Sequence, residues 1–262
     1  MKKVLFFILS LLLSLTLVGC GKDSEKTTDY VKDNEWMSPG AMIEEYLKDD
    51  TKKVSEVKFT LEFVDEDGLA YIGYMRFVLF NNLAPKTVDN FVKLTEKGYY
   101  DNLKMTRLVK DTLVQGGDPE ETTTKETKEQ TNTIKGEFEE NEFFNNLSHN
   151  SGVISMARAT DLDSASSQFF VVASNFQSVD GSYAAFGCLL EEKNEDGSSL
   201  TYEQRNYTVT EDGKKVLYDY DCLNLLVTLS IENDASDGAP VDTIAIVKGE
   251  VLQKDVLMSA IK

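Results

Sequence analysis

Histidine and cysteine are scarce in this chain. Its 262 residues include one His and three Cys. A single histidine cannot build a Ser/His/Asp or Cys/His nucleophile system, in which a general base must lie beside the nucleophile. One His and so few Cys also cannot supply the ligands of a recognisable zinc site, so we expect no metal and no cofactor. Cys188 and Cys222 leave two alternatives open, a disulfide formed outside the cytoplasm or two buried free thiols.

Positive charge is scarce as well. The chain has 27 Lys and Arg against 45 Asp and Glu, which gives a net charge of −18 at pH 7. Nucleic-acid binding requires a basic surface that neutralises phosphates, and adhesion to anionic lipid requires one too. Both classes of partner are therefore disfavoured, and the acidic surface indicates solubility rather than a specific ligand.

The one long apolar run stands at the N-terminus. Residues 4–18 follow Lys2 and Lys3 and are apolar apart from Ser and Thr. The run is too short for a comfortable transmembrane helix and fits the hydrophobic region of a signal peptide. It ends in Leu-Val-Gly-Cys at Cys20, which resembles the bacterial lipobox. The resemblance implies a signal peptide over 1–19, lipid on Cys20, and a protein held outside the cytoplasm on the bacterial cell membrane. An ordinary signal peptide with a chance Cys, or an uncleaved anchor, are the alternatives.

The rest of the chain predicts a tether followed by one domain. Residues 20–52 are polar and charged, with a short helix expected around 39–48, and residues 53–262 are long enough for one large domain. Apolar alternation and apolar runs predict strands over 57–64, 71–80, 108–114, 152–156, 168–173, 184–190 and 243–252. Helices are expected from Pro85 to Gly98 and over 220–231. Surface insertions are expected near 120–133 and 191–219. Many strands with two helices favour a mainly β fold, a closed antiparallel barrel capped at its ends.

Five segments share their order and spacing with one protein family. They are Ala84–Phe91, the Gln-Gly-Gly-Asp of 115–118, Gly136–Asn141, Gly152–Phe170, and the pair Asp180-Gly181 and Phe186-Gly187. Together they resemble the cyclophilins, the cyclosporin-type peptidyl-prolyl isomerases. The resemblance implies a closed eight-stranded antiparallel barrel capped by two helices, and proline-containing polypeptides as partners.

The resemblance also implies the site residues. Arg107, eight residues before Gln115, takes the place of the family's catalytic arginine, and Gln115 lies beside it. The substrate-binding positions that follow from the resemblance are Thr112, Leu113, Met156, Ala157, Arg158, Gln168, Phe170, Val179 and Tyr183. Taken without the resemblance, Met156 and Phe170 are equally compatible with barrel core, and Arg107 with a solvated charge at a strand edge. His149, the single histidine, is given a structural role because no acid–base partner is visible in the sequence.

This chain departs from the family pattern at the proline pocket. Thr112 stands where the family has an aromatic wall, Ser178 falls near a tryptophan that contacts cyclosporin, and Tyr183 replaces a histidine. Loss of the aromatic wall weakens proline binding by about 1–3 kcal/mol. Two functions therefore stay open: an isomerase that assists the folding of exported proteins at the membrane surface, and a catalytically weak module that binds proline-containing peptides or acts as a chaperone. A solute-binding lipoprotein is disfavoured, because the chain shows no two-lobed α/β pattern.

Overall fold

The computed structural model describes residues 35–261 except 125–127, 192–193, 195–197, 199, 202–203, 205–208 and 211. Residues Glu35–Lys262 form one compact unit. Cys20 and the predicted signal peptide lie outside the described residues. Within the described part of the chain, no helix is both long and apolar enough to cross a bilayer.

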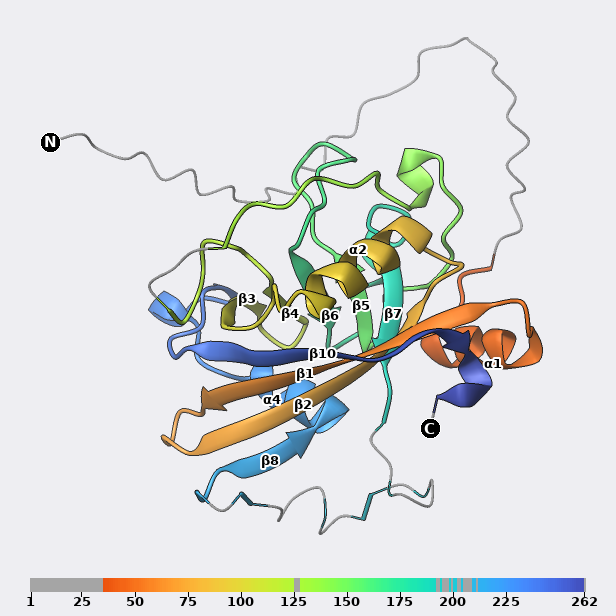
Figure 1. Ribbon diagram of the computed structural model, residues 1–262. Helices are drawn as coiled ribbons and strands as arrows, with labels where there is room; N and C mark the ends of the chain where they lie inside the picture. Colours follow the sequence, from red (N-terminus) through yellow and green to blue (C-terminus); the bar gives the residue numbers. More distant parts are fainter. Residues whose placement is uncertain are drawn as a thin grey trace, which may run out of the picture. The chain divides into compact units, whose positions relative to one another are not determined.

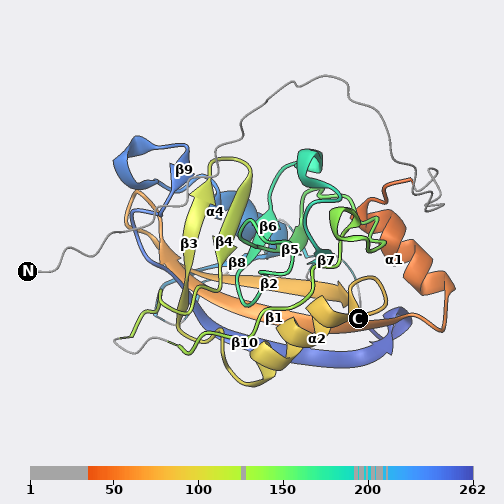
Figure 2. The same ribbon diagram turned by 90° about the horizontal axis from the view of Figure 1, so that it is seen from above.

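Eight strands close into an antiparallel barrel, as predicted. They are β1 (Lys53–Val64), β2 (Ala70–Phe80), β3 (Leu103–Val109), β4 (Leu113–Gly116), β5 (Val153–Met156), β6 (Phe169–Val172), β7 (Ala185–Leu189) and β10 (Ile244–Leu257). Their order is β1-β10-β3-β4-β6-β5-β7-β2, and β2 pairs with β1 from Val54↔Phe80 to Val64↔Ala70, which closes the ring. Figure 1 shows β10, β1, β2 and β8 side by side, and Figure 2 shows the remaining strands from above.

Two short strands lie outside this ring. Strand β8 (Lys215–Tyr218) pairs with β2 in parallel. Strand β9 (Asp237–Gly238) pairs with the end of β3 through Leu108↔Gly238 and Val109↔Asp237. The second pairing brings a segment from the C-terminal part of the chain against the strand that carries Arg107.

The two predicted helices are present and pack on the barrel. Helix α2 (Pro85–Glu96) packs against β10, β1 and β2, and α4 (Asp219–Leu226) against β2 and β8. Pro85 begins α2, and the buried carboxylate of Glu137 accepts hydrogen bonds from the backbone N–H groups of Lys86 (3.0 Å) and Thr87 (2.8 Å). A carboxylate at a helix N-terminus satisfies amide groups that have no partner inside the helix. Two of the segments that carry the family resemblance are therefore joined at this cap.

A third helix corrects the predicted domain boundary. The expected short helix is present as α1 (Pro39–Lys48), with Ser38 as its N-cap, but it is packed rather than part of a tether. Met42 and Tyr46 are buried in a cluster with Val54, and the Tyr46 ring lies 4.9 Å from that of Phe80. The domain therefore begins at Glu35 rather than at residue 53, because two apolar side chains one helical turn apart give this polar segment a face to bury.

Further differences concern strand ends and the two expected insertions. The run 108–114 was expected to be one strand, but a turn at 110–112 divides it into β3 and β4, and Asp111 adopts a positive φ of 55° there. Strand β10 extends to Leu257, five residues beyond the expected end. Of the expected insertion at 120–133, Glu121 and Thr122 lie against β3: the backbone N–H of Lys104 donates to Glu121 O (2.9 Å), and Thr122 pairs with Leu103. Much of 191–219 lies outside the described residues, and its end forms β8.

The alternation of side chains along β6 defines two faces. Phe169 and Val171 point into the barrel interior, where Phe169 contacts Phe59, Phe91 and Tyr100 at ring distances of 5.5–5.6 Å. Phe170 and Val172 point to the opposite side of the strand. Successive residues of a strand face opposite sides of the sheet, so the interior core positions the outward side chains.

Candidate active site

An apolar cluster lies on the outer side of strands β4 and β6. We call it the outer cluster: Leu113, Phe170 and Val172 are buried in it, and Val109, Ala157, Phe176 and Tyr183 pack around them half-buried. In the strand register Gln115 lies opposite Phe170, and Phe170 lies opposite Ser155. Neighbouring strands thus place polar and apolar side chains on one face.

Arg107 lies beside this cluster and is joined to Gln115. The two residues are paired in the β3–β4 register, and Arg107 Nη1 donates to Gln115 Oε1 at 3.3 Å. Gln115 Nε2 donates in turn to Gln168 Oε1 (3.0 Å), and Gln168 Nε2 to Asp118 Oδ2 (3.0 Å). The predicted residues Arg107, Gln115 and Gln168 therefore form one hydrogen-bonded row along the edge of the outer cluster.

Gly117 explains how Asp118 reaches the end of this row. It has a positive φ of 86°, and a Cβ atom there would stand 2.6 Å from the carbonyl oxygen of Ser167. Only glycine adopts that conformation and that approach without strain. The Gln-Gly-Gly-Asp sequence thus allows a tight turn at the end of β4. This turn brings the side chains of Gln115 and Asp118 within hydrogen-bonding distance of Gln168.

Asp237 is a site residue that sequence reasoning missed. Its carboxylate accepts from Arg107 Nε (2.6 Å) and Arg107 Nη2 (2.7 Å) in a two-pronged ion pair. Hydrogen bonding to Asp237 raises the pKa of Arg107, and hydrogen bonding from Arg107 lowers the pKa of Asp237. The residue lies 130 positions from Arg107, between the helix expected over 220–231 and the strand expected over 243–252, so only the pairing of β9 with β3 could have revealed it.

A buried hydrogen-bond network supports the ring of Phe170. His149 stacks on it, with ring centroids 5.9 Å apart and planes at 14°. His149 Nδ1 donates to Asp180 Oδ1 (2.7 Å), because a carboxylate only accepts, and His149 Nε2 lies 3.0 Å from Ser155 Oγ. Burial acts to raise the pKa of Asp180, but hydrogen bonds from His149 and Ser148 outweigh it and hold the pKa below its usual value. The structural role expected for His149 agrees with these contacts, with Asp180 as its partner.

Tyr183 and Arg158 close the other side of the cluster. Tyr183 meets Phe170 edge to face, with ring centroids 5.7 Å apart. The guanidinium of Arg158 lies between the rings of Tyr183 (4.7 Å) and Phe138 (5.2 Å), and its Nε donates to Ser182 O (3.0 Å). The backbone N–H of Ala157 donates to Gln168 O at 3.0 Å. The Arg158 side chain thus holds Tyr183 in place.

Three predicted pocket residues are placed differently from the rest. Met156 is 1% exposed and belongs to the barrel interior, on the side of β5 opposite to Ser155, so its expected place in the pocket is wrong. Val179 ends the short helix η2 (Gln177–Val179), outside the outer cluster. Thr112 lies half-buried in the β3–β4 turn, where its hydroxyl donates to Lys110 O (3.0 Å) and presents no apolar wall. The strand alternation explains the placement of Met156, because its neighbour Ser155 takes the outward position.

The geometry provides a cation, amide donors and an apolar surface on one face. A guanidinium offers five N–H donors, and the bonds to Asp237 and Gln115 engage three of them. Phe170 and Tyr183 offer ring surface beside it. Such a site can bind an extended peptide and stabilise charge on an amide, without a nucleophile. Among the residues that the structure describes, no group of three or more His, Cys, Asp or Glu side chains could hold a metal ion.

Comparison with known proteins identifies the family. Residues 63–195 match the family described as cyclophilin type peptidyl-prolyl cis-trans isomerase. The chain is 38% identical over 117 residues to a peptidyl-prolyl cis-trans isomerase-like 1 of Neurospora crassa, over 44% of this chain and 68% of that protein. It is 36% identical over 117 residues to the peptidyl-prolyl cis-trans isomerase cypE of Dictyostelium discoideum, over 44% of this chain and 71% of that protein. A crystal structure of a Cryptosporidium parvum cyclophilin shares the fold, with a TM-score of 0.50 and 22% identity over 75% of this chain and 99% of that one. This chain belongs to the family of cyclophilin type peptidyl-prolyl cis-trans isomerases.

Proposed function

We propose that the protein isomerises prolyl bonds in exported proteins at the outer surface of the cell membrane, where lipid on Cys20 holds it. The observation that carries the catalytic part is the joining of Arg107 to the outer cluster through Gln115. The N-terminal sequence, with its apolar run and Cys20, supports the location.

The reaction requires little covalent equipment. A prolyl amide resists rotation because the nitrogen lone pair is delocalised into the carbonyl, and the isomers interconvert over tens to hundreds of seconds. In a twisted amide the lone pair is localised on nitrogen, where the guanidinium of Arg107 stabilises it. Phe170 and Tyr183 hold the proline ring, and Gln115 and Gln168 bind peptide groups on either side. The rate gain comes from donors arranged in advance for the twisted state.

The decisive experiment follows the refolding of a secreted protein whose slow phase is limited by a prolyl isomerisation. The protein without residues 1–20, added in catalytic amounts, should accelerate that phase in proportion to its concentration and leave the fast phases unchanged. Proline-limited phases take about 10–100 s at 25 °C, so the acceleration is easily timed. A slow phase that keeps its background rate at high protein concentration would contradict the proposal.

A second candidate function rests on Thr112. Its place in the turn leaves the outer cluster without the aromatic wall of the family. A module that binds proline-containing peptides with little turnover, as a chaperone would, is compatible with that loss. Peptide binding without acceleration of the slow phase would select this alternative.

The location has its own test. In a bacterium that makes the full chain, we expect the protein in the membrane fraction and a mature N-terminus at Cys20 with the mass of a lipid adduct. Cys20→Ser should move the protein out of that fraction, because a signal peptidase for lipoproteins requires the cysteine. Cys188→Ser is the matched control, since it changes a buried thiol of the barrel. Membrane association of the Cys20→Ser protein would contradict the lipid anchor.

A further inference from the structure

Both arginines of the site are paired with exposed carboxylates. Arg107 is bound by Asp237, whose side chain is 48% exposed, and Arg158 Nη2 lies 3.6 Å from Glu140 Oε2, whose side chain is 55% exposed. Asp118 adds a third carboxylate at Gln168. Among these described groups the carboxylates outnumber the arginines, so the cations that a peptide would meet are already matched by negative charge.

The position of Asp237 is built into the fold. The segment 230–241 folds back on itself, with Glu232 N donating to Ala239 O (2.9 Å) and Val241 N to Ser230 O (2.9 Å). Ile231 is buried in the barrel core and anchors one arm. The backbone N–H of Lys110 donates to Ser236 O (2.9 Å), which ties the tip to the β3–β4 turn. Four contacts of the backbone and core thus hold the Asp237 carboxylate against Arg107.

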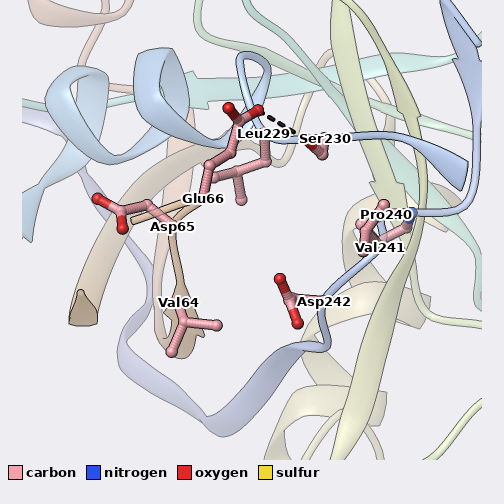
Figure 3. A pocket seen from close by; sticks show the side chains of 8 residues that line it. All are labelled: Val64, Asp65, Glu66, Leu229, Ser230, Pro240, Val241 and Asp242. Carbon is pink, nitrogen blue, oxygen red and sulfur yellow. Dashed lines mark hydrogen bonds between the residues drawn. The ribbon is translucent and has the colours of Figure 1, made fainter. Parts of the chain in front are cut away.

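The base of this segment, where Ser230 and Val241 meet, lies at the end away from Asp237. A hydrogen bond between Ser230 and Glu66 fixes it there, as Figure 3 shows. A pocket of about 190 Å³ lies there, lined by Val64, Asp65, Glu66, Leu229, Ser230, Pro240, Val241 and Asp242. Two of its acidic side chains, from the turn between β1 and β2, accept hydrogen bonds. Ser230 Oγ donates to Glu66 (2.6 Å), and Tyr71 Oη donates to Asp65 (2.8 Å). The bond from Ser230 to Glu66 joins the base of 230–241 to the β1–β2 turn.

We propose that Asp237 makes the site of Arg107 and the outer cluster select prolyl segments that carry a basic residue next to the proline over segments that carry an acidic one. The inference rests on the proposed isomerase function and names the substrate class of the same site. A half-exposed carboxylate attracts a lysine of the peptide and repels a glutamate. The carboxylate of Asp237 also neutralises the charge of Arg107, so an acidic peptide segment meets no unpaired cation at this pair.

The test compares two peptides that differ only before the proline, Ala-Lys-Pro-Phe and Ala-Glu-Pro-Phe with both ends blocked. The chain beginning at Gly21 should show a higher kcat/KM for the lysine peptide at low salt. Unit charges about 8 Å apart in water change a binding constant roughly twofold, in opposite directions for the two peptides. Asp237→Asn should therefore lower the lysine-to-glutamate ratio roughly fourfold. About 0.5 M salt should lower the ratio of the wild type too.

Two variants make the result specific. Asp237→Glu keeps the charge and should keep the ratio. Asp234→Asn removes the same charge three residues away, from an exposed position of positive φ that Asn tolerates, and should leave the ratio unchanged. Equal kcat/KM for both peptides in the wild type, or a ratio that Asp237→Asn does not move, would overturn the inference.

Binding measurements separate this inference from the proposed function. If neither peptide is turned over, the isomerase proposal fails, but the affinities of the two peptides still report the charge preference. Tighter binding of the lysine peptide that is lost in Asp237→Asn would then support the inference alone. Turnover of both peptides at equal rates would leave the isomerase in place and remove the role of Asp237.

Discussion

The two halves of the candidate site are held in different ways. On one side, Phe170 rests on His149, which is 1% exposed and bonded to Asp180 and Ser155. On the other side, Arg107 is 36% exposed and held by the half-exposed Asp237. The first half is fixed by buried packing and hydrogen bonds, and the second by an ion pair at the surface.

This difference separates what the fold requires from what can vary. Removing one partner of a buried hydrogen bond leaves the other partner unsatisfied, with no water to replace it. Substitutions in the Phe170 half therefore lower the stability of the barrel. Exposed ion pairs contribute little to stability, so the Arg107 half can change its charge and its turn residues at small cost to folding. Thr112, a departure from the family pattern, and Asp237, the partner of Arg107, both lie in the second half.

The largest effect on activity should come from Arg107→Ala. Removal of a donor that acts on the transition state lowers the rate by about a hundredfold or more, and the thermal stability should stay near that of the wild type because the pair is exposed. Lys104→Ala is the matched control. It removes a positive charge from the same strand, but the Lys104 side chain forms an ion pair with Glu121 rather than with the residues of the site. Refolding kinetics and thermal unfolding measure both variants. Full activity of Arg107→Ala would show that Arg107 is not the catalytic cation. It would also contradict the division of the site into a stabilising half and a catalytic half.

Asp180→Asn should act on stability rather than on the chemical step. The side chain accepts from Ser148 Oγ, from the backbone N–H of His149 and from its ring, and Asn cannot accept all three at full strength. We expect a loss of about 1–3 kcal/mol in the free energy of unfolding, measured with urea.

The same variant tests a pH dependence. The pKa of Asp180 is lower in the folded protein than its usual 3.8. The folded state therefore binds fewer protons, and the stability contribution is complete above pH ~5 and declines as the pH falls through the usual value towards the folded one. The difference between wild type and Asp180→Asn should shrink over that range. A difference that stays constant down to pH ~3 would contradict the assignment.

The sequence predicts the fold better than it predicts the second half of the site. The barrel, α2, α4 and the residues Arg107, Gln115, Gln168 and Phe170 follow from local patterns and from segments that keep their spacing. Met156 was misplaced because an apolar residue in a fully buried strand does not reveal which side it faces, and β5 is buried on both. Asp237 could not be found because its partner lies across a pairing between distant segments, which no local pattern encodes. Helix α1 was found, but its packing was not, because burial depends on the surface it meets.

The smallest effect should come from restoring the missing wall with Thr112→Phe. Thr112 lies half-buried in the turn, directly before Leu113 of the outer cluster, and its carbonyl accepts from Ala173 N (2.7 Å), so the backbone there is fixed. An aromatic ring at this position should enclose the proline and raise kcat/KM about three- to tenfold, mainly through KM. Thr112→Val removes the hydroxyl bond to Lys110 without adding a ring and should not produce the gain. In the Arg107→Ala background the ring should tighten peptide binding but restore no turnover, because binding belongs to the apolar surface and rotation to the cation. A gain in turnover without Arg107 would mean that the two halves do not divide the work in this way.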